Sequence, residues 1–336
     1  MYLALYRKYR PRTFDDVISQ PQIVTTLKNQ IATGQNTHAY LFTGSRGTGK
    51  TTCAKILAMA LNCKHPVNGN PCLECESCRE IADGSATDIV EMDAASNNKV
   101  EDVHLLQDQL AYTPVSCKYR VYIVDEVHML STAAFNALLK TIEEPPAHAV
   151  FLLLAERAEA FLPTILSRVV VMKIRPLSAE TIADYLMQAG HLAEESHILS
   201  AYAQGRIGQA LELVADEGFR EMRQDILGKL EALPSMSEGD AYLLAKDLEG
   251  YKNDLRFLDI MELWYRDLLT AKSLREEGYL IQRDKKDAIF RAAKEPAALL
   301  AKKAAAVRTA RMRLAQNANF RLTMEVMLMD LKETGK

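Results

Sequence analysis

Eight residues have the types and the spacing needed to hold a chain of phosphates. They read Gly44-Ser45-Arg46-Gly47-Thr48-Gly49-Lys50-Thr51, and Thr52 follows them. In this pattern the glycines turn backbone N–H groups toward phosphates, Lys50 reaches the β- and γ-phosphates, and the Thr51 hydroxyl is placed to ligate Mg²⁺. An apolar, strand-like run at 39–43 precedes the motif and a helical pattern at 52–58 follows it. This context predicts an ATP·Mg²⁺ site, and the alternative is a glycine-rich turn without a ligand.

A second motif supplies two carboxylates. The apolar run at 121–124 ends in Asp125-Glu126. Asp125 is placed to hold Mg²⁺ together with Thr51, directly or through water, and Glu126 is placed to polarise an attacking water. Two acids after an apolar strand are common, but an upstream phosphate-binding loop makes the pair specific. We therefore predict catalytic roles for Lys50, Asp125 and Glu126.

Four cysteines lie on a short segment between these two motifs. Cys63, Cys72, Cys75 and Cys78 follow the pattern C-x8-C-x2-C-x2-C. Four thiols at this spacing suit tetrahedral Zn²⁺, and disulfides are disfavoured in a reducing compartment. We predict a structural zinc site without catalysis, because four protein ligands leave no open position. Cys53 and Cys117 are expected to be ordinary buried or half-buried residues.

The composition limits the class of protein. The chain has 336 residues, 41 basic and 44 acidic, for a net charge of −3, which gives no global argument for nucleic-acid binding. Its length suits two or three domains. We find no apolar run long enough for a membrane span and no signal-peptide layout at the N-terminus. We expect a cytoplasmic protein that does not contact a membrane.

The elements that must position these motifs alternate between strand and helix. Helical patterns at 22–36, 52–58, 100–111 and 131–144 alternate with strand-like runs at 39–43, 87–93, 120–125 and 149–154. This alternation predicts an α/β fold with a doubly wound parallel sheet. Beyond about residue 220 the pattern is almost wholly helical, with one long helix expected at 296–329. Its basic residues more often mark a solvated or subunit-facing surface than a DNA contact.

The N-terminal segment is basic and aromatic. We expect six of its residues to form one wall of an adenine pocket: Tyr6, Arg7, Arg10, Pro11, Val17 and Ile18. The alternative is a simple arm with a solvated basic face.

These motifs together resemble a known family. The phosphate-binding loop, the box at 125–128, the four-cysteine insert and the run at 140–146 are similar to those of the gamma/tau subunit of bacterial DNA polymerase III, the AAA+ ATPase of the clamp loader. The segments at 6–11 and 93–98 also resemble that family.

The resemblance implies an architecture and partners. It implies an AAA+ domain at 1–175 with a zinc insert at about 63–78, a helical lid at 176–220 and a helical oligomerisation collar at 221–336. It also implies a hetero-oligomeric ring with gamma/tau, delta and delta-prime subunits, in which ATP drives loading of a sliding clamp onto primed DNA. Ser167-Arg168 then corresponds to the finger that reaches a neighbouring subunit's nucleotide.

Some positions depart from the family pattern. Ala155 stands where a polar sensor is expected, and Gly208 stands where the lid normally has an arginine, with Arg206 two residues earlier. The segment at 316–325 resembles the delta-prime subunit. We favour an ATP-hydrolysing motor, and the alternative is a delta-prime-like stator that supplies Arg168 without hydrolysing ATP. A helicase or a zinc-dependent nucleic-acid binder outside replication fits the cysteine spacing and the tail less well.

Overall fold

The computed structural model of this chain describes residues 10–333. The chain divides into two compact units, Met1–Thr181 with Gly205–Gln209, and Ile182–Gln204 with Ala210–Lys336. Tyr6 and Arg7, predicted in the adenine wall, lie outside the described residues. Within residues 10–333, no helix combines the length and apolar character that crossing a membrane requires.

The first unit is built on a parallel sheet of five strands in the order β2-β3-β4-β1-β5. The strands are β1 (Ala39–Thr43), β2 (Ile89–Asp93), β3 (Arg120–Asp125), β4 (Ala149–Ala155) and β5 (Val170–Lys173). Every residue of the central strands β1 and β4 is buried, as expected for strands covered on both faces. The predicted α/β parallel fold is confirmed. The sequence analysis did not identify β5.

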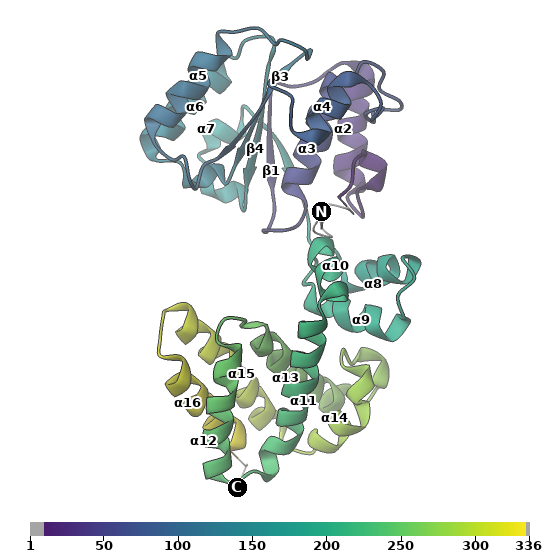
Figure 1. Ribbon diagram of the computed structural model, residues 1–336, viewed down its shortest axis with the longest axis vertical. Helices are drawn as coiled ribbons and strands as arrows, with labels where there is room; N and C mark the ends of the chain where they lie inside the picture. Colours follow the sequence, from purple (N-terminus) through teal and green to yellow (C-terminus); the bar gives the residue numbers. More distant parts are fainter. Residues whose placement is uncertain (1–9, 334–336) are drawn as a thin grey trace. The chain divides into compact units, whose positions relative to one another are not determined.

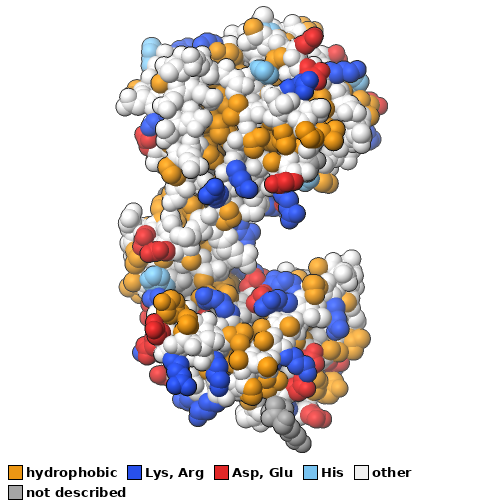
Figure 2. Space-filling view, turned by 180° about the vertical axis from the view of Figure 1, so that it is seen from behind, with side chains coloured by type: hydrophobic (Ala, Val, Ile, Leu, Met, Phe, Trp, Pro, Cys, Tyr) orange, Lys and Arg blue, Asp and Glu red, His pale blue; other side chains and the backbone are white. Residues whose placement is uncertain are grey.

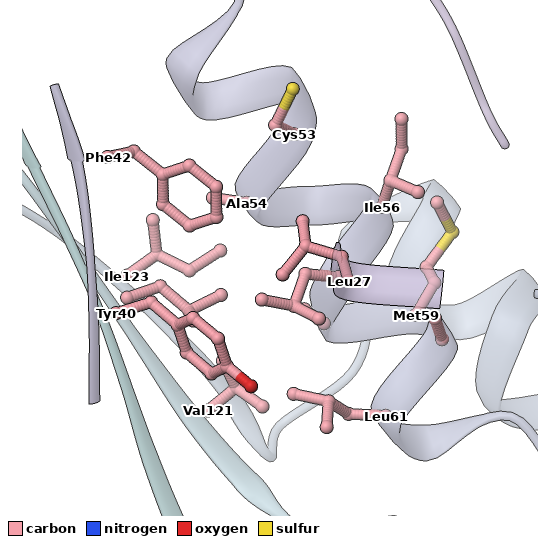
Figure 3. Close-up of a cluster of buried hydrophobic side chains, with 14 of the residues drawn as sticks. Leu27, Tyr40, Phe42, Cys53, Ala54, Ile56, Met59, Leu61, Val121 and Ile123 are labelled. Carbon is pink, nitrogen blue, oxygen red and sulfur yellow. The ribbon is translucent and has the colours of Figure 1, made fainter. Parts of the chain in front are cut away.

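Helices cover both faces of this sheet (Figure 1). One side carries α2 (Pro21–Thr33), α3 (Lys50–Asn62) and α4 (Glu76–Asp83), and the other carries α5 (Val100–Leu110), α6 (Thr132–Glu143) and α7 (Pro163–Leu166). Alternate residues of each strand face the two layers. In Figure 3, Tyr40, Phe42 and Ile123 point from the strands toward the α3 side.

The second unit is wholly helical in its described part. Its elements include the end of α8 (Ala179–Gln188), α9 (Ala193–Tyr202) and the end of α10 (Ile207–Ala215), and they continue with α11 (Glu217–Ala232), α12 (Glu238–Asp247), α13 (Arg256–Leu274), α14 (Lys286–Ala292), α15 (Ala297–Ala315) and α16 (Phe320–Lys332). Helix α13 is its central element and buries Phe257, Trp264 and Leu268 against its neighbours.

The prediction of one long helix at 296–329 is wrong, because the helix is interrupted by a turn between α15 and α16. Asn317 adopts a left-handed backbone conformation with φ of 61°, which no α-helix contains. The Asn319 side chain then accepts a hydrogen bond from the Leu322 N–H at 3.0 Å and caps the start of α16. Two asparagines therefore end one helix and begin the next.

Most basic residues of α15 lie against acidic residues of the same unit. Arg308 lies 3.1 Å from Glu262, and Arg311 lies 2.7 Å from Asp259. Lys303 pairs with Glu295. Figure 2 accordingly shows basic and acidic side chains interspersed on the face of the helical unit. This neutralisation favours the interpretation of α15 as a solvated or subunit-facing surface rather than a DNA contact.

A buried carboxylate fixes the loop that leads into β3. The side chain of Asp88 is fully buried. Its carboxylate accepts hydrogen bonds from the backbone N–H groups of Val115, Ser116 and Cys117 at 3.0, 2.8 and 2.9 Å. The guanidinium of Arg120 donates to it at 3.3 Å. Burial raises the pKa of the Asp88 carboxyl, but these donors outweigh burial and hold the pKa below its ordinary value.

We expect Asp88→Asn to lower the free energy of unfolding by on the order of 3–5 kcal/mol, because it leaves Arg120 without its counter-charge and turns an amide toward N–H donors. A lowered pKa means that this stabilisation is complete above the unfolded-state pKa of about 4 and is lost as the pH falls through the folded-state value. Urea denaturation of wild type and variant at several pH values would measure both effects. The exposed Asp83→Asn is the matched control, and an equal effect of the two substitutions would contradict the prediction.

Candidate functional site

The phosphate-binding loop connects β1 to α3, as its sequence context predicts. Gly44 and Gly47 have φ values of 154° and 82°. A Cβ atom at Gly44 would lie 2.5 Å from the backbone oxygen of Ile174, so only glycine fits this close approach. The loop is thereby held against the chain that follows β5.

The Lys50 side chain is folded over this loop. Only 6% of Lys50 is exposed, and its ammonium donates to the backbone oxygens of Gly44 and Ser45 at 2.8 and 3.2 Å. Phosphate oxygens bound in the loop can replace these two acceptors. The Lys50 ammonium thus lies over the loop, and its contact with phosphate stays a prediction.

The two chemical motifs meet across the sheet. The Thr51 hydroxyl, at the start of α3, donates to Oδ2 of Asp125, at the end of β3, over a distance of 3.1 Å. Hydroxyl and carboxylate oxygens are ligands that Mg²⁺ accepts, and the cation usually keeps several waters beside one or two such ligands. The donor set therefore fits the predicted magnesium site.

Glu126 has an unusual backbone at the same edge of the sheet. Its φ is 49°, a left-handed conformation that is uncommon for a non-glycine residue, and its N–H donates to Asp125 Oδ1 at 2.9 Å. His128 Nδ1 lies 3.5 Å from a carboxylate oxygen of Glu126. Such backbone conformations persist where surrounding contacts fix them, which is frequent at functional sites.

Part of the predicted adenine wall adjoins the loop. Arg10 donates from Nε to the Thr52 hydroxyl at 3.0 Å. Pro11, Val17 and Ile18 are half-buried, and Val17 packs against the core cluster on the α3 side of the sheet. Their contact with adenine stays a prediction.

Arg206 is a site residue that the sequence analysis did not place at the nucleotide site. The segment Gly205–Gln209 belongs to the first unit, and a Cβ at Gly47 would lie 3.0 Å from Cδ of Arg206. A Cβ at Gly208 would meet no atom within 4 Å among the described residues. The arginine whose side chain lies beside the phosphate-binding loop is therefore two residues before the expected position.

The second position that departs from the family pattern, Ala155, lies at the end of β4. Ala155 is fully buried, and the Gly44 N–H donates to its backbone oxygen at 3.3 Å. This position supports the loop through its backbone and has no polar side-chain group to contact a phosphate.

Arg168 is exposed just beyond α7. Its Nε lies 3.1 Å from a carboxylate oxygen of Glu143, at the end of α6, and its Nη1 donates to the backbone oxygen of Thr164 at 2.6 Å. Among the residues that the structure describes, its hydrogen-bond and ion-pair partners include none from the phosphate-binding loop. The structure thus does not add Arg168 to the chain's own nucleotide site.

The four cysteines of the predicted zinc insert converge. The sulfur atoms of Cys63, Cys72, Cys75 and Cys78 all lie within 4.8 Å of one another. The Cys72 N–H donates to the Cys63 sulfur at 3.2 Å and the Cys75 N–H to the Cys72 sulfur at 3.3 Å. Four sulfurs 2.3 Å from a tetrahedral Zn²⁺ would be about 3.8 Å apart, so the cluster fits the ion with little movement.

The thiol environments differ within the chain. Burial raises the pKa of Cys72, but the N–H donors of Cys75 and Glu74 outweigh it and bring the pKa to about 6. Cys53 lies apart from the cluster, on α3, where burial raises its pKa to about 12 (Figure 3). Cys53 is buried and Cys117 half-buried, as predicted.

The known proteins to which this chain is similar are named as subunits of DNA polymerase III. A family model described as "DNA polymerase III, delta subunit" matches residues 19–178, and one described as its C-terminal part matches residues 217–333. The DNA polymerase III subunit tau of Bacillus subtilis is 36% identical over 86% of this chain, which spans 56% of that relative.

The subunit gamma of Buchnera aphidicola subsp. Acyrthosiphon pisum is 41% identical over 82% of this chain and 72% of its own length. A solved gamma subunit-related protein from Thermotoga maritima has 20% identity and a TM-score of 0.44, over 92% of this chain and 98% of its own. Because the gamma subunit of Buchnera aphidicola is 41% identical and is matched over 72% of its length, the chain belongs to the gamma/tau subunit family of DNA polymerase III.

Proposed function

We propose that this chain is a clamp-loader subunit that binds and hydrolyses Mg·ATP. The contact between Thr51 and Asp125 carries the proposal, because it joins two motifs 74 residues apart at 3.1 Å beside Lys50. A strand–loop–helix turn without a ligand has no need for a hydroxyl, a carboxylate and a buried lysine at one edge of the sheet. Family membership supports the same activity.

Each residue has a defined task in this proposal. Lys50 exchanges the backbone oxygens of Gly44 and Ser45 for phosphate oxygens, and Thr51 and Asp125 hold Mg²⁺, which neutralises charge on the phosphates. Glu126 orients the attacking water. Arg206, beside Gly47, supplies the positive charge that Gly208 lacks.

We infer the partners of this chain from its family and not from contacts in the structure. We propose a hetero-oligomeric ring with gamma/tau, delta and delta-prime subunits that loads a sliding clamp onto primed DNA. The first unit contains the nucleotide site, and the three-part division at 175 and 220 remains part of the proposal. The cysteine cluster holds a structural zinc ion.

A second candidate is a delta-prime-like stator that binds its neighbours without hydrolysing ATP. Two observations favour it: Ala155 has no polar group at the first sensor position, and Arg168 is exposed, where a neighbour's nucleotide could meet it. In that case the ATP site of this chain would be inactive, and Arg168 would act on the adjacent subunit.

Titration of the purified chain with a fluorescent ATP analogue and Mg²⁺ tests the nucleotide site on which the first candidate depends. We expect Lys50→Ala to weaken binding by at least about 100-fold, because it removes charge-assisted hydrogen bonds to phosphate worth about 3 kcal/mol or more in sum. Lys55→Ala, on the same helix but paired with Glu91 at 2.6 Å, is the matched control and should bind as wild type does. Absence of binding by a folded wild-type chain would refute the motor and leave the stator.

A further inference from the structure

The loop at 64–71, within the four-cysteine insert, contains a tight turn that contacts the N-terminal part of the first unit. Val67 and Asn70 exchange two backbone hydrogen bonds at 3.0 and 2.9 Å, and between them lie an asparagine and a glycine with φ of 51° and 78°. Positive φ at both central positions is typical of a type I′ turn, which Asn-Gly favours. A Cβ atom at Gly69 would lie 2.6 Å from Cα of Lys28 on α2, so the turn packs closely on that helix.

Two hydrogen bonds join the Asn70 side chain to the segment at 10–20. Its Oδ1 accepts the Phe14 N–H at 3.0 Å, and its Nδ2 donates to Oδ2 of Asp15 at 2.6 Å. Because the amide oxygen can only accept and the amide nitrogen can only donate, these two partners fix the orientation of the side chain. Lys28 donates to the other oxygen of Asp15 at 2.6 Å, so the carboxylate is held from both sides.

Two further contacts fasten the ends of the segment at 10–20 beside the phosphate-binding loop. At one end, Arg10 donates to the hydroxyl of Thr52, which directly follows the loop motif. At the other end, the Gln20 side chain is only 8% exposed, donates to the backbone oxygen of Arg175 at 2.7 Å and accepts its N–H at 3.3 Å. Arg175 belongs to the chain that follows β5, where the loop is held. The middle of the segment is fastened from the cysteine insert.

We propose that Asn70 is a positioning residue for recognition of the nucleotide base. The buried Phe14 ring anchors the segment in the core, and the amide of Asn70 holds the backbone at that point. The predicted adenine wall lies on both sides of it, at Pro11 and at 17–18, so the placement of the wall follows from the backbone that Asn70 holds. This role rests on the proposed ATP site and concerns the base alone, because the two bonds of Asn70 go to the segment and not to the phosphate-binding loop. Folding of the cysteine insert is thereby coupled to binding of the base.

The test compares a ligand that has the base with one that lacks it. Isothermal calorimetry measures the binding of Mg·ATP and of Mg·tripolyphosphate to the full wild-type chain and to Asn70→Asp. The substitution keeps an acceptor for the Phe14 N–H but places a carboxylate against Asp15, so it pushes the segment away from the insert. We expect Mg·ATP to bind about tenfold more weakly and Mg·tripolyphosphate to bind as it does to the wild type.

A reciprocal exchange and a matched control identify the contact. Asn70→Asp combined with Asp15→Asn restores one donor and one acceptor in exchanged places, keeps the net charge and leaves an oxygen for Lys28. We expect this double variant to recover most of the affinity for Mg·ATP, as a direct pairwise interaction requires. Asn68→Asp makes the same change at an exposed position of the same turn, where aspartate is also favoured, and should bind both ligands as the wild type does.

Three results would overturn the role of Asn70. They are unchanged Mg·ATP binding by Asn70→Asp, an equal weakening of both ligands, which indicates a purely structural role, and no recovery in the double variant. A wild-type chain that binds tripolyphosphate as tightly as ATP makes no use of the base and overturns this role alone. A wild-type chain that binds neither ligand refutes the proposed ATP site, and the role of Asn70 with it.

Discussion

In the proposed clamp-loader assembly, Arg168→Ala is expected to lower the rate of ATP hydrolysis by on the order of 10³–10⁵-fold at the neighbouring site that the proposed finger would complete. The expectation rests on the place of Arg168 in the structure. It is exposed, it lies beyond the short helix α7, and it contacts Glu143 and Thr164. An arginine that serves a neighbour's nucleotide must be on the surface before assembly. Steady-state ATPase measurements on the complex, with wild-type chain replaced by the variant, give the change.

Three controls separate this role from a loss of folding. Binding of the fluorescent ATP analogue to the isolated Arg168→Ala chain should equal wild type, because the side chain is not part of the chain's own site. Arg157→Ala removes another exposed arginine of the same unit and should leave hydrolysis unchanged. Glu143→Gln removes the ion pair with Arg168 and should not slow hydrolysis, since the pair must open for the finger to act. Unchanged hydrolysis by the complex with Arg168→Ala would refute the finger.

The parts of the site that could be predicted from the sequence are those whose residues are contiguous or closely spaced in the chain. The phosphate-binding loop, the Asp125-Glu126 pair and the four cysteines each lie on one short segment whose order fixes the local geometry. The alternation of strand and helix then requires the loop and the carboxylates to meet, because the carboxyl ends of parallel strands share one edge of the sheet. The Thr51–Asp125 contact is the observed result.

Arg206 could not be placed in this way. Its contact with the loop depends on the chain returning to the first unit at Gly205–Gln209, after a segment that belongs to the second unit. Gly205 makes this return with a φ of 81°, and a Cβ there would lie 2.5 Å from Pro176. Counting residues from the Ala210-Leu211 pair pointed to Gly208 instead. The sequence signal that could have indicated Arg206 is Gly205 immediately before it, because a glycine permits the turn that brings the arginine to the loop.

The missed strand and the missed helix break have different causes. Strand β5 has four residues at the edge of the sheet, and only Met172 among them is buried, so its hydrophobic pattern is weak. The break before α16 has a clear local signal, since asparagines at 317 and 319 favour a left-handed turn and a helix N-cap. The apolar periodicity on both sides concealed that signal. In both elements tertiary context or turn chemistry outweighed periodicity.

Removal of zinc is expected to unfold the insert at 63–78. Structural zinc sites in small peptides contribute about 10–16 kcal/mol of binding free energy, which is folding free energy when the apo segment has little structure of its own. The four sulfurs lie within 4.8 Å of one another, and without the ion they are left with weak hydrogen bonds such as those from the Cys72 and Cys75 N–H groups. We expect the purified chain to retain zinc after dialysis and to release it to a strong chelator. Limited proteolysis should then cut within the insert.

The matched pair for this test is Cys72→Ser and Cys117→Ser. Both cysteines are half-buried, but only Cys72 belongs to the cluster. Loss of zinc and rapid proteolysis should follow Cys72→Ser alone. A chain that is purified without zinc and resists proteolysis equally before and after chelation would contradict the prediction. Because Cys78 lies in the first turn of α4, which packs on α3, unfolding of the insert should also weaken the helix that carries Lys50. Binding of the ATP analogue should therefore decline in Cys72→Ser and stay normal in Cys117→Ser.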